Sequence, residues 1–381
     1  MCRAPDWAEQ ERDAAGKQKY REVVLDQKYP SLGQIKSWLP KEVFELSTAK
    51  SMAYWARDAG GMAAMMGAIV GLCRSGAFAA LPFALQCALL LPLQFAAGFF
   101  MWCMFVVGHD CGHTTFSPHQ PVNELMGELS HSVLLCTPFA PWRRSHHRHH
   151  SYHNHIKEDY SHMWYTESQR SKVLRLPHLA LHYTIRVATP FLNWWTYLYV
   201  GQPDGGHLFL YGRLWKDATT AEMVRGYASS AVAVAAMFGW YALLGEAVVR
   251  AYCLPWMWYG WWLFTVTFFQ HHFDEMLLFR EGAWSYVRGA FETIDRTFGR
   301  GVDHLHHNIT DGHVVHHLFF TKIPHFHLMQ ATRAMQEGLA KEGFAHLYKH
   351  QHTPAFAVDI HKFLHKNWFW VKDDKVVNKV L

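Results

Sequence analysis

The sequence lacks the cysteine patterns of a disulfide-stabilised or zinc-finger protein. None of its seven cysteines forms a pair in the CxxC spacing that structural zinc sites and redox motifs use. Several fall in apolar stretches, where we expect reduced, structural thiols. The seven are Cys2, Cys73, Cys87, Cys103, Cys111, Cys136 and Cys253.

The first 40 residues lack the apolar core of a secretory signal, because they are polar and carry charges of both signs. A transit peptide would be poor in acidic residues, yet Asp6, Glu9, Glu11 and Asp13 come early. We therefore expect the first hydrophobic segment to serve as the insertion signal. Residues 1–50 are then expected to form an N-terminal segment in the cytosol.

Charge is missing from one long stretch, since Ala77 to Val107 contains no charged residue. At about 1.5 Å per residue, a helix of this length exceeds the roughly 30 Å hydrocarbon core of a bilayer. The chain is 50% hydrophobic and 15% aromatic, which is unusual for a soluble enzyme. Similar apolar runs predict four membrane spans, near residues 60–74, 81–107, 227–249 and 251–270.

The predicted fold class is all-α: a four-span helical membrane protein with a cytosolic helical cap. Four spans make two hairpins, which return the chain each time to the side from which it started. Residues 108–226 and 271–381 would form the cap, and residues 51–381 together would form one membrane domain. Nearly all lysines and arginines lie on the cap side, which marks that side, with both termini, as cytosolic.

Histidine is abundant, with 29 residues, and much of it falls in three clusters. One cluster has the spacing HxxxH and two have the spacing HxxHH. Residues three and four apart share one face of a helix, so the clusters would aim eight imidazoles inward from three elements. One tetrahedral zinc takes four ligands, so eight imidazoles suit a pair of metal ions. The eight are His109, His113, His146, His149, His150, His313, His316 and His317.

Other metal chemistries fit the spacing less well. In the HxxxH frame of zinc proteases a glutamate acts as base, but here Asp110 occupies its place. Carboxylate-bridged di-iron proteins need Glu-x-x-His from two helices, and the sequence offers only Glu128 with His131. A haem pair would need histidines inside the membrane, whereas these clusters follow the spans. An all-nitrogen site at the membrane surface remains, and iron that activates O₂ is the metal we expect.

Further ligands are expected close to these clusters. His271 lies at the cytosolic end of the last predicted span, and His307 lies six residues before His313. Either could be a ninth ligand. Asn308 and Asp311 are candidates to orient a ligand through hydrogen bonds.

Longer motifs around the clusters carry a family resemblance. They are Gly108–His113, Trp142 before the second cluster, Val200–Gly205, and His307 through His325. From about Pro30 to about Thr332 the chain resembles the membrane-bound fatty acid desaturases, in particular the methyl-end acyl desaturases. The resemblance implies two non-haem irons and O₂ as co-substrate, and the endoplasmic reticulum membrane as location. It also implies a membrane-lipid acyl chain as substrate, with acyl-CoA as the alternative carrier.

The resemblance also implies that electrons come from a separate cytochrome b5 and its reductase. Front-end desaturases carry a fused module with the tetrapeptide His-Pro-Gly-Gly and a glutamine at the start of the third cluster. This sequence lacks the tetrapeptide and has His313 at that position.

Several activities stay open. An omega-3 desaturase is the first choice, a delta-12 desaturase is the alternative, and a fatty acyl hydroxylase is a third. A histidine-rich metal transporter is the non-enzyme alternative, but it would want ionisable ligands within the spans. We expect no nucleic-acid partner, and the sequence leaves homo-oligomerisation open.

Overall fold

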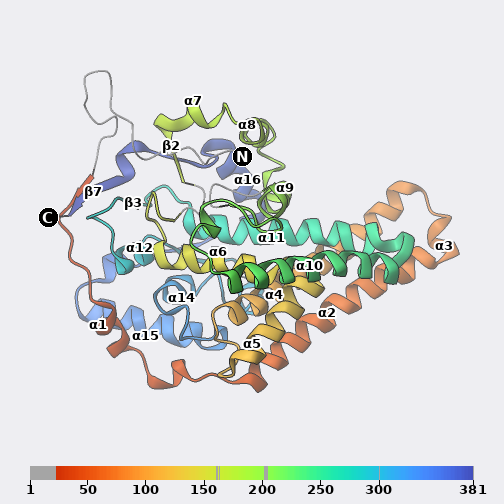
Figure 1. The fold of residues 1–381 in the computed structure, drawn as a ribbon, viewed down its shortest axis with the longest axis horizontal. Helices are drawn as coiled ribbons and strands as arrows, with labels where there is room; N and C mark the ends of the chain where they lie inside the picture. The colour runs from red at the N-terminus through yellow and green to blue at the C-terminus, as the bar shows by residue number, and fades with distance from the viewer. Residues whose placement is uncertain (1–22, 160–161, 163, 201–204, 300, 381) are drawn as a thin grey trace.

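The computed structural model describes residues 23–380 except 160–161, 163, 201–204 and 300. Residues 201–204 of the Val200–Gly205 motif and residues 1–22 of the expected N-terminal segment therefore lie outside the described residues. The long helices are α2 (Thr48–Arg74), α4 (Phe83–Gly112), α10 (Thr220–Leu244) and α11 (Leu254–His271). Helices α2, α4 and α11 pack side by side, and α10 contacts η2 (Glu128–Leu134) and α6 (Phe139–Tyr152). In Figure 1, α3 (Gly76–Ala79) lies at one end of the long helices and the shorter elements are gathered at the other.

Helix α4 is the centre of this layer, because it packs against both α2 and α11. Its close approach to α11 depends on Gly98. A Cβ at Gly98 would lie 2.4 Å from the Trp258 Cβ and 2.6 Å from the Pro255 carbonyl oxygen. Helix α10 begins at a capping box in which Thr219 and Glu222 bond each other's backbone amides.

Two helices of the described chain are long and apolar enough to cross a membrane, Phe83–Gly112 and Thr220–Ala247. The predicted spans near 81–107 and 227–249 fall in them. The predicted spans near 60–74 and 251–270 fall in α2 and α11, which do not meet the same criterion. Helix α2 carries the charged residues Arg57 and Asp58 in its first half, and α11 is rich in tryptophan, whose hydropathy is low.

The structure is mostly helical, as predicted, but the described residues also hold seven short strands that the all-α prediction did not include and that form small parallel sheets. Their partners lie far apart in the sequence, and each strand is too short for a recognisable alternation of apolar and polar residues. The strands are β1 (Val23–Leu25), β2 (Tyr165–Thr166), β3 (Leu278–Phe279), β4 (Asp295–Thr297), β5 (His350–His352), β6 (Trp370–Val371) and β7 (Val376–Val380). They pair in the orders β1-β7-β3, β2-β6 and β4-β5.

Shorter helices surround the end of the layer where α4 and α11 finish. Apolar side chains of α1, α14 and α15 form a second core there, separate from the core around α4 and α11. These helices are α1 (Leu32–Trp38), α5 (Gln120–Gly127), α6 (Phe139–Tyr152), α7 (Arg170–Val173), α8 (Pro177–Thr184), α9 (Thr189–Trp195), α12 (Tyr286–Phe291), α13 (Val302–Leu305), α14 (His313–Phe319), α15 (Leu328–Lys341) and α16 (Phe356–Lys366).

Ten short 3₁₀ or π turns connect or extend these helices in the described chain. They are η1 (Lys41–Phe44), η2 (Glu128–Leu134), η3 (Glu167–Gln169), η4 (Thr196–Val200), η5 (Arg213–Trp215), η6 (Gly245–Ala247), η7 (Val249–Cys253), η8 (His325–His327), η9 (Ala345–Leu347) and η10 (Asp373–Lys375).

Candidate metal centre

Four helices deliver histidines to one region of the molecule. The last turn and C-cap of α4 carry the first cluster, α6 carries the second and α14 carries the third. Helix α11 ends at His271, which faces the same region. The helical spacing predicted from the sequence is what turns each cluster inward.

The first histidine group draws on three of these helices. Its members are His109, His113, His146, His150 and His316, and one ring nitrogen from each lies within 4.8 Å of the others. The Nε2 atoms of His109 and His113 are 3.2 Å apart, and those of His146 and His150 are 3.0 Å apart. All but the half-buried His146 are buried.

The second histidine group contains His149, His271 and His317, whose nitrogens also lie within 4.8 Å of one another. His313 adjoins it, because its Nε2 is 3.1 Å from the Nε2 of His271. The Nε2 atoms of His149 and His271 are 3.2 Å apart. Counting His313, the two groups hold five and four histidines, which are the eight cluster histidines together with His271.

The donor set fits metal cations. Burial, followed by the neighbouring imidazoles, lowers the pKa of His113, His150 and His317 well below the usual value. Neutral imidazoles offer lone pairs to a metal. Several nitrogens of both groups have no hydrogen-bond partner although they are buried, including His316 Nε2 and both ring nitrogens of His317. Burying nitrogen atoms without hydrogen-bond partners destabilises the fold, unless a cation lies between their lone pairs.

Asp159 orients the second group, and the sequence prediction missed it. The His149 Nδ1 donates to the buried carboxylate of Asp159 at 2.8 Å, which leaves the Nε2 lone pair directed at His271. The other carboxylate oxygen accepts hydrogen bonds from the Trp164 indole at 3.0 Å and from the Asn154 amide at 3.1 Å. The one available signal was an acidic residue ten positions after the histidine.

Two more aspartates hold the elements that carry the clusters. Asp110 accepts a bond from His325 Nδ1 at 2.8 Å, and its other oxygen lies 3.5 Å from the Nδ1 of His109. Asp295 accepts a bond from the Val314 amide at 2.8 Å, at the start of α14, and another from the Tyr348 hydroxyl at 2.7 Å.

The other sequence candidates lie apart from the two groups. His307 Nε2 donates to the fully buried Asp58 at 2.7 Å, so the structure places this candidate ligand against α2. Asn308 donates to Asp311 at 3.2 Å, so this candidate pair of orienting residues bonds to each other.

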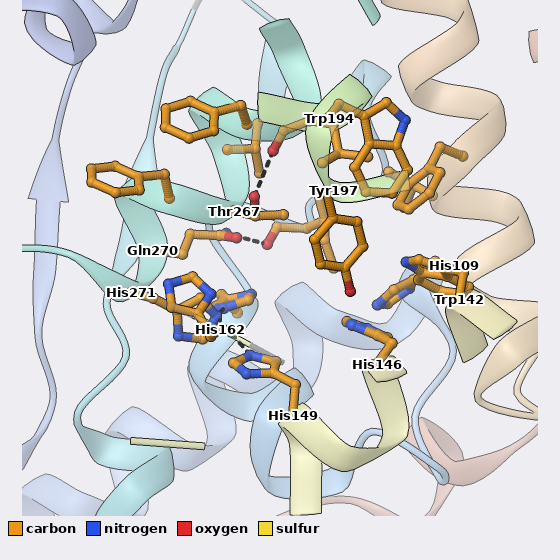
Figure 2. A pocket seen from close by; sticks show the side chains of 18 of the residues that line it. His109, Trp142, His146, His149, His162, Trp194, Tyr197, Thr267, Gln270 and His271 are labelled. Carbon is orange, nitrogen blue, oxygen red and sulfur yellow. Dashed lines mark hydrogen bonds between the residues drawn. The ribbon is translucent and has the colours of Figure 1, made fainter. Parts of the chain in front are cut away.

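An apolar cavity opens directly onto both groups. Histidines of each group line it, and so do aromatic and aliphatic side chains of α4, α9 and α11. In Figure 2, Trp194, Tyr197 and Thr267 lie on one side of the cavity, opposite His146 and His149. The Tyr197 hydroxyl is 2.7 Å from the hydroxyl of Ser145. A long, unreactive hydrocarbon chain is the kind of ligand that such a lining suits.

Comparison with known proteins agrees with this geometry. Residues 85–350 match the family model described as fatty acid desaturase. The chain is 33% identical over 317 residues to the delta(12) fatty acid desaturase fat-2 of Caenorhabditis elegans, covering 81% of this chain and 80% of that protein. It is 31% identical over 359 residues to the omega-3 fatty acid desaturase fat-1 of the same organism, covering 92% and 82%.

A plant relative is similar to the same degree. The acyl-lipid omega-3 desaturase (cytochrome b5), endoplasmic reticulum, of Arabidopsis thaliana is 34% identical over 316 residues, covering 81% of this chain and 77% of that protein. The chain belongs to the fatty acid desaturase family.

Proposed function

We propose that the protein is an O₂-dependent acyl desaturase in which the two histidine groups each hold one iron. The first iron would be held by His109, His113, His146, His150 and His316, and the second by His149, His271, His313 and His317. The observation that carries this proposal is the shared cavity, because two neutral histidine groups face one apolar space of the kind that a lipid chain can fill.

The reaction converts a –CH₂–CH₂– unit, O₂, two electrons and two protons into a –CH=CH– unit and two waters. Iron supplies the capacity to activate O₂. The chain's own residues supply position and dryness: the aromatic wall around Trp194 holds the acyl chain against the histidines and excludes water. Asp159 fixes the ring of His149, so that one ligand of the second group is preorganised.

For the position of the new double bond, we propose the methyl end of an unsaturated acyl chain, with omega-3 as the first choice. The relatives support the methyl-end class, since they are named as delta-12 and omega-3 enzymes. Delta-12 desaturation is the second candidate, favoured by the similarity to fat-2.

Expression in a host that makes oleate and linoleate, followed by chromatography of total fatty acids, tests this function. We expect new omega-3 species. An increase in linoleate without omega-3 products would indicate delta-12 desaturation. Hydroxy acids, or an unchanged profile with the protein present in membranes, would reject desaturation. His316→Ala serves as the inactive control.

We also propose four spans, with α2 and α11 joining α4 and α10, in the membrane of the endoplasmic reticulum and with both termini in the cytosol. The support is that α4 packs against both α2 and α11, and that the histidines which end α4 and α11 belong to the two groups. Cytochrome b5 and its reductase would then reach the cap from the cytosol. A glycosylation acceptor introduced at Ser75, between α2 and α3, should be modified in the lumen, whereas acceptors at the two termini should not.

A further inference from the structure

Helix α6 has a second functional face besides the one that carries ligands. His146, His149 and His150 point into the metal centre, while Arg144, His147 and Arg148 line a groove on the outside of the helix. The groove runs between α6, the start of α10 and η5. Its lining and that of the apolar cavity share no residue.

The groove is rich in arginine. Arg143, Arg144, Arg148, Arg213 and Arg225 line it, together with the acidic residues Asp217 and Glu222. Arg143 and Arg225 lie against Glu124, Arg144 pairs with Glu222 and Arg148 pairs with Glu158, so five arginines face four carboxylates. Arg213 and Arg225 form an exposed rim beside the exposed Asp217 and Glu222, and the Arg225 side chain, which is 60% exposed, lies 3.8 Å from Glu124. Groove and rim together keep an excess of one arginine, which favours contact with a negatively charged surface.

One side chain connects this groove with the first histidine group. The ring of His147 packs against that of His113, with centroids 5.5 Å apart and ring planes inclined by 29°. Its Nε2 donates to the Gly112 carbonyl at 2.8 Å. His113 is fully buried and belongs to the first group. A molecule seated in the groove is thus separated from the metal centre by about the width of one helix, roughly 10 Å.

We propose that this groove is the docking site of a one-electron carrier protein with an acidic face, and that His147 is the contact through which electrons enter. The inference rests on the proposed function, because desaturation needs two electrons that neither the acyl chain nor O₂ supplies. Each docking oxidises one donor centre by one electron and reduces the metal centre by one, so two dockings serve one turnover. No bond forms or breaks in this step.

A lipid phosphate is the competing occupant, since arginines also bind phosphate. The separation of groove and cavity argues against it, because a headgroup in the groove would not lead its own chain into the cavity. The contact of His147 with His113 has no use in headgroup binding, whereas it shortens the path of an electron.

The experiment uses the full-length, iron-loaded protein in neutral nanodiscs and the soluble haem domain of a reduced cytochrome b5 as the probe. Stopped-flow spectroscopy without O₂ follows oxidation of the haem. The rim variant is Arg213→Glu with Arg225→Glu, and the matched control is Arg333→Glu on the exposed face of α15. A third variant, His147→Ala, tests the entry residue. Each protein is also reduced with a small chemical reductant.

The rim variant should slow haem oxidation on the order of tenfold at low salt and weaken its salt dependence, because charge steering acts on the association rate. His147→Ala should slow it without changing the salt dependence, and Arg333→Glu should match the wild type. The small reductant should reduce all four proteins alike.

Equal rates of haem oxidation in the rim variant and the Arg333→Glu control would overturn the docking site. The docking site would also be overturned if the rim variant oxidised the haem at the wild-type rate but bound phospholipid substrate less tightly. That result would indicate that the groove binds a lipid headgroup. If the wild type accepts electrons from the small reductant but makes no desaturated product with O₂ and lipid, the proposed function fails instead.

Discussion

At the residue scale, the proposed metal centre depends on histidines whose neighbours decide their role. His271 and His307 are both buried, and both were candidates for a ninth ligand. The structure separates them: His271 lies between His149 and His313, whereas His307 is bonded to Asp58. Burial alone does not place a ligand: His149 is also bonded to a carboxylate and still faces His271, whereas His307 lies apart from both groups, against α2.

These two histidines give a matched pair of variants. His271→Ala should lower the iron content per folded chain, because it removes one of the four nitrogens of the second group. His307→Ala should keep the iron content but cost about 1–3 kcal/mol of stability, since it removes a partner of the buried Asp58. Metal analysis and thermal unfolding of both purified variants check this. Full iron in His271→Ala, together with iron loss in His307→Ala, would reverse the assignment.

At the element scale, the relative positions of α4 and α11 set the distance between the clusters that they carry. Gly98 permits this packing, because its position lies against the backbone of α11 at Pro255. A side chain there would push apart two helices whose ends hold His109 and His271. The distance between His109 and His271 therefore depends on Gly98, although Gly98 is not one of the proposed ligands.

Gly98→Ala should destabilise the protein by roughly 1–3 kcal/mol, the usual cost of overpacking a buried contact. Gly239→Ala on α10 is the control, because a Cβ there meets nothing within 4 Å and alanine favours a helix. Thermal unfolding of the two variants in the same detergent measures the difference. Equal melting temperatures would show that the α4–α11 contact tolerates a wider spacing.

At the scale of the whole molecule, the sequence predicts the long helices and the eight cluster histidines because both follow regular patterns. A charge-free run long enough to span a membrane predicts α4, and the HxxHH spacing places three imidazoles on one face of α6. The residues that the prediction missed follow no such pattern. Asp159 and Asp295 reach the clusters through tertiary contacts, and strands such as β4 pair with partners about 50 residues away.

The same limit explains the uncertain spans. Hydropathy finds α4 and α10, but α2 carries Arg57 and Asp58 in its first half, and Asp58 is buried against His307 by the fold. In the sequence alone, a charged residue such as Asp58 counts against a buried or membrane-spanning helix. The partner that compensates its charge becomes visible only in the tertiary structure.

The most direct test of the account is the metal content of the purified wild-type protein. Two histidine groups, of five and four members, predict about two iron ions per chain. Elemental analysis of protein expressed with iron and zinc both available measures this. About two irons per chain, lost together with desaturase activity on chelation and restored with added iron, is the predicted result. One zinc per chain and no iron would contradict the central claim.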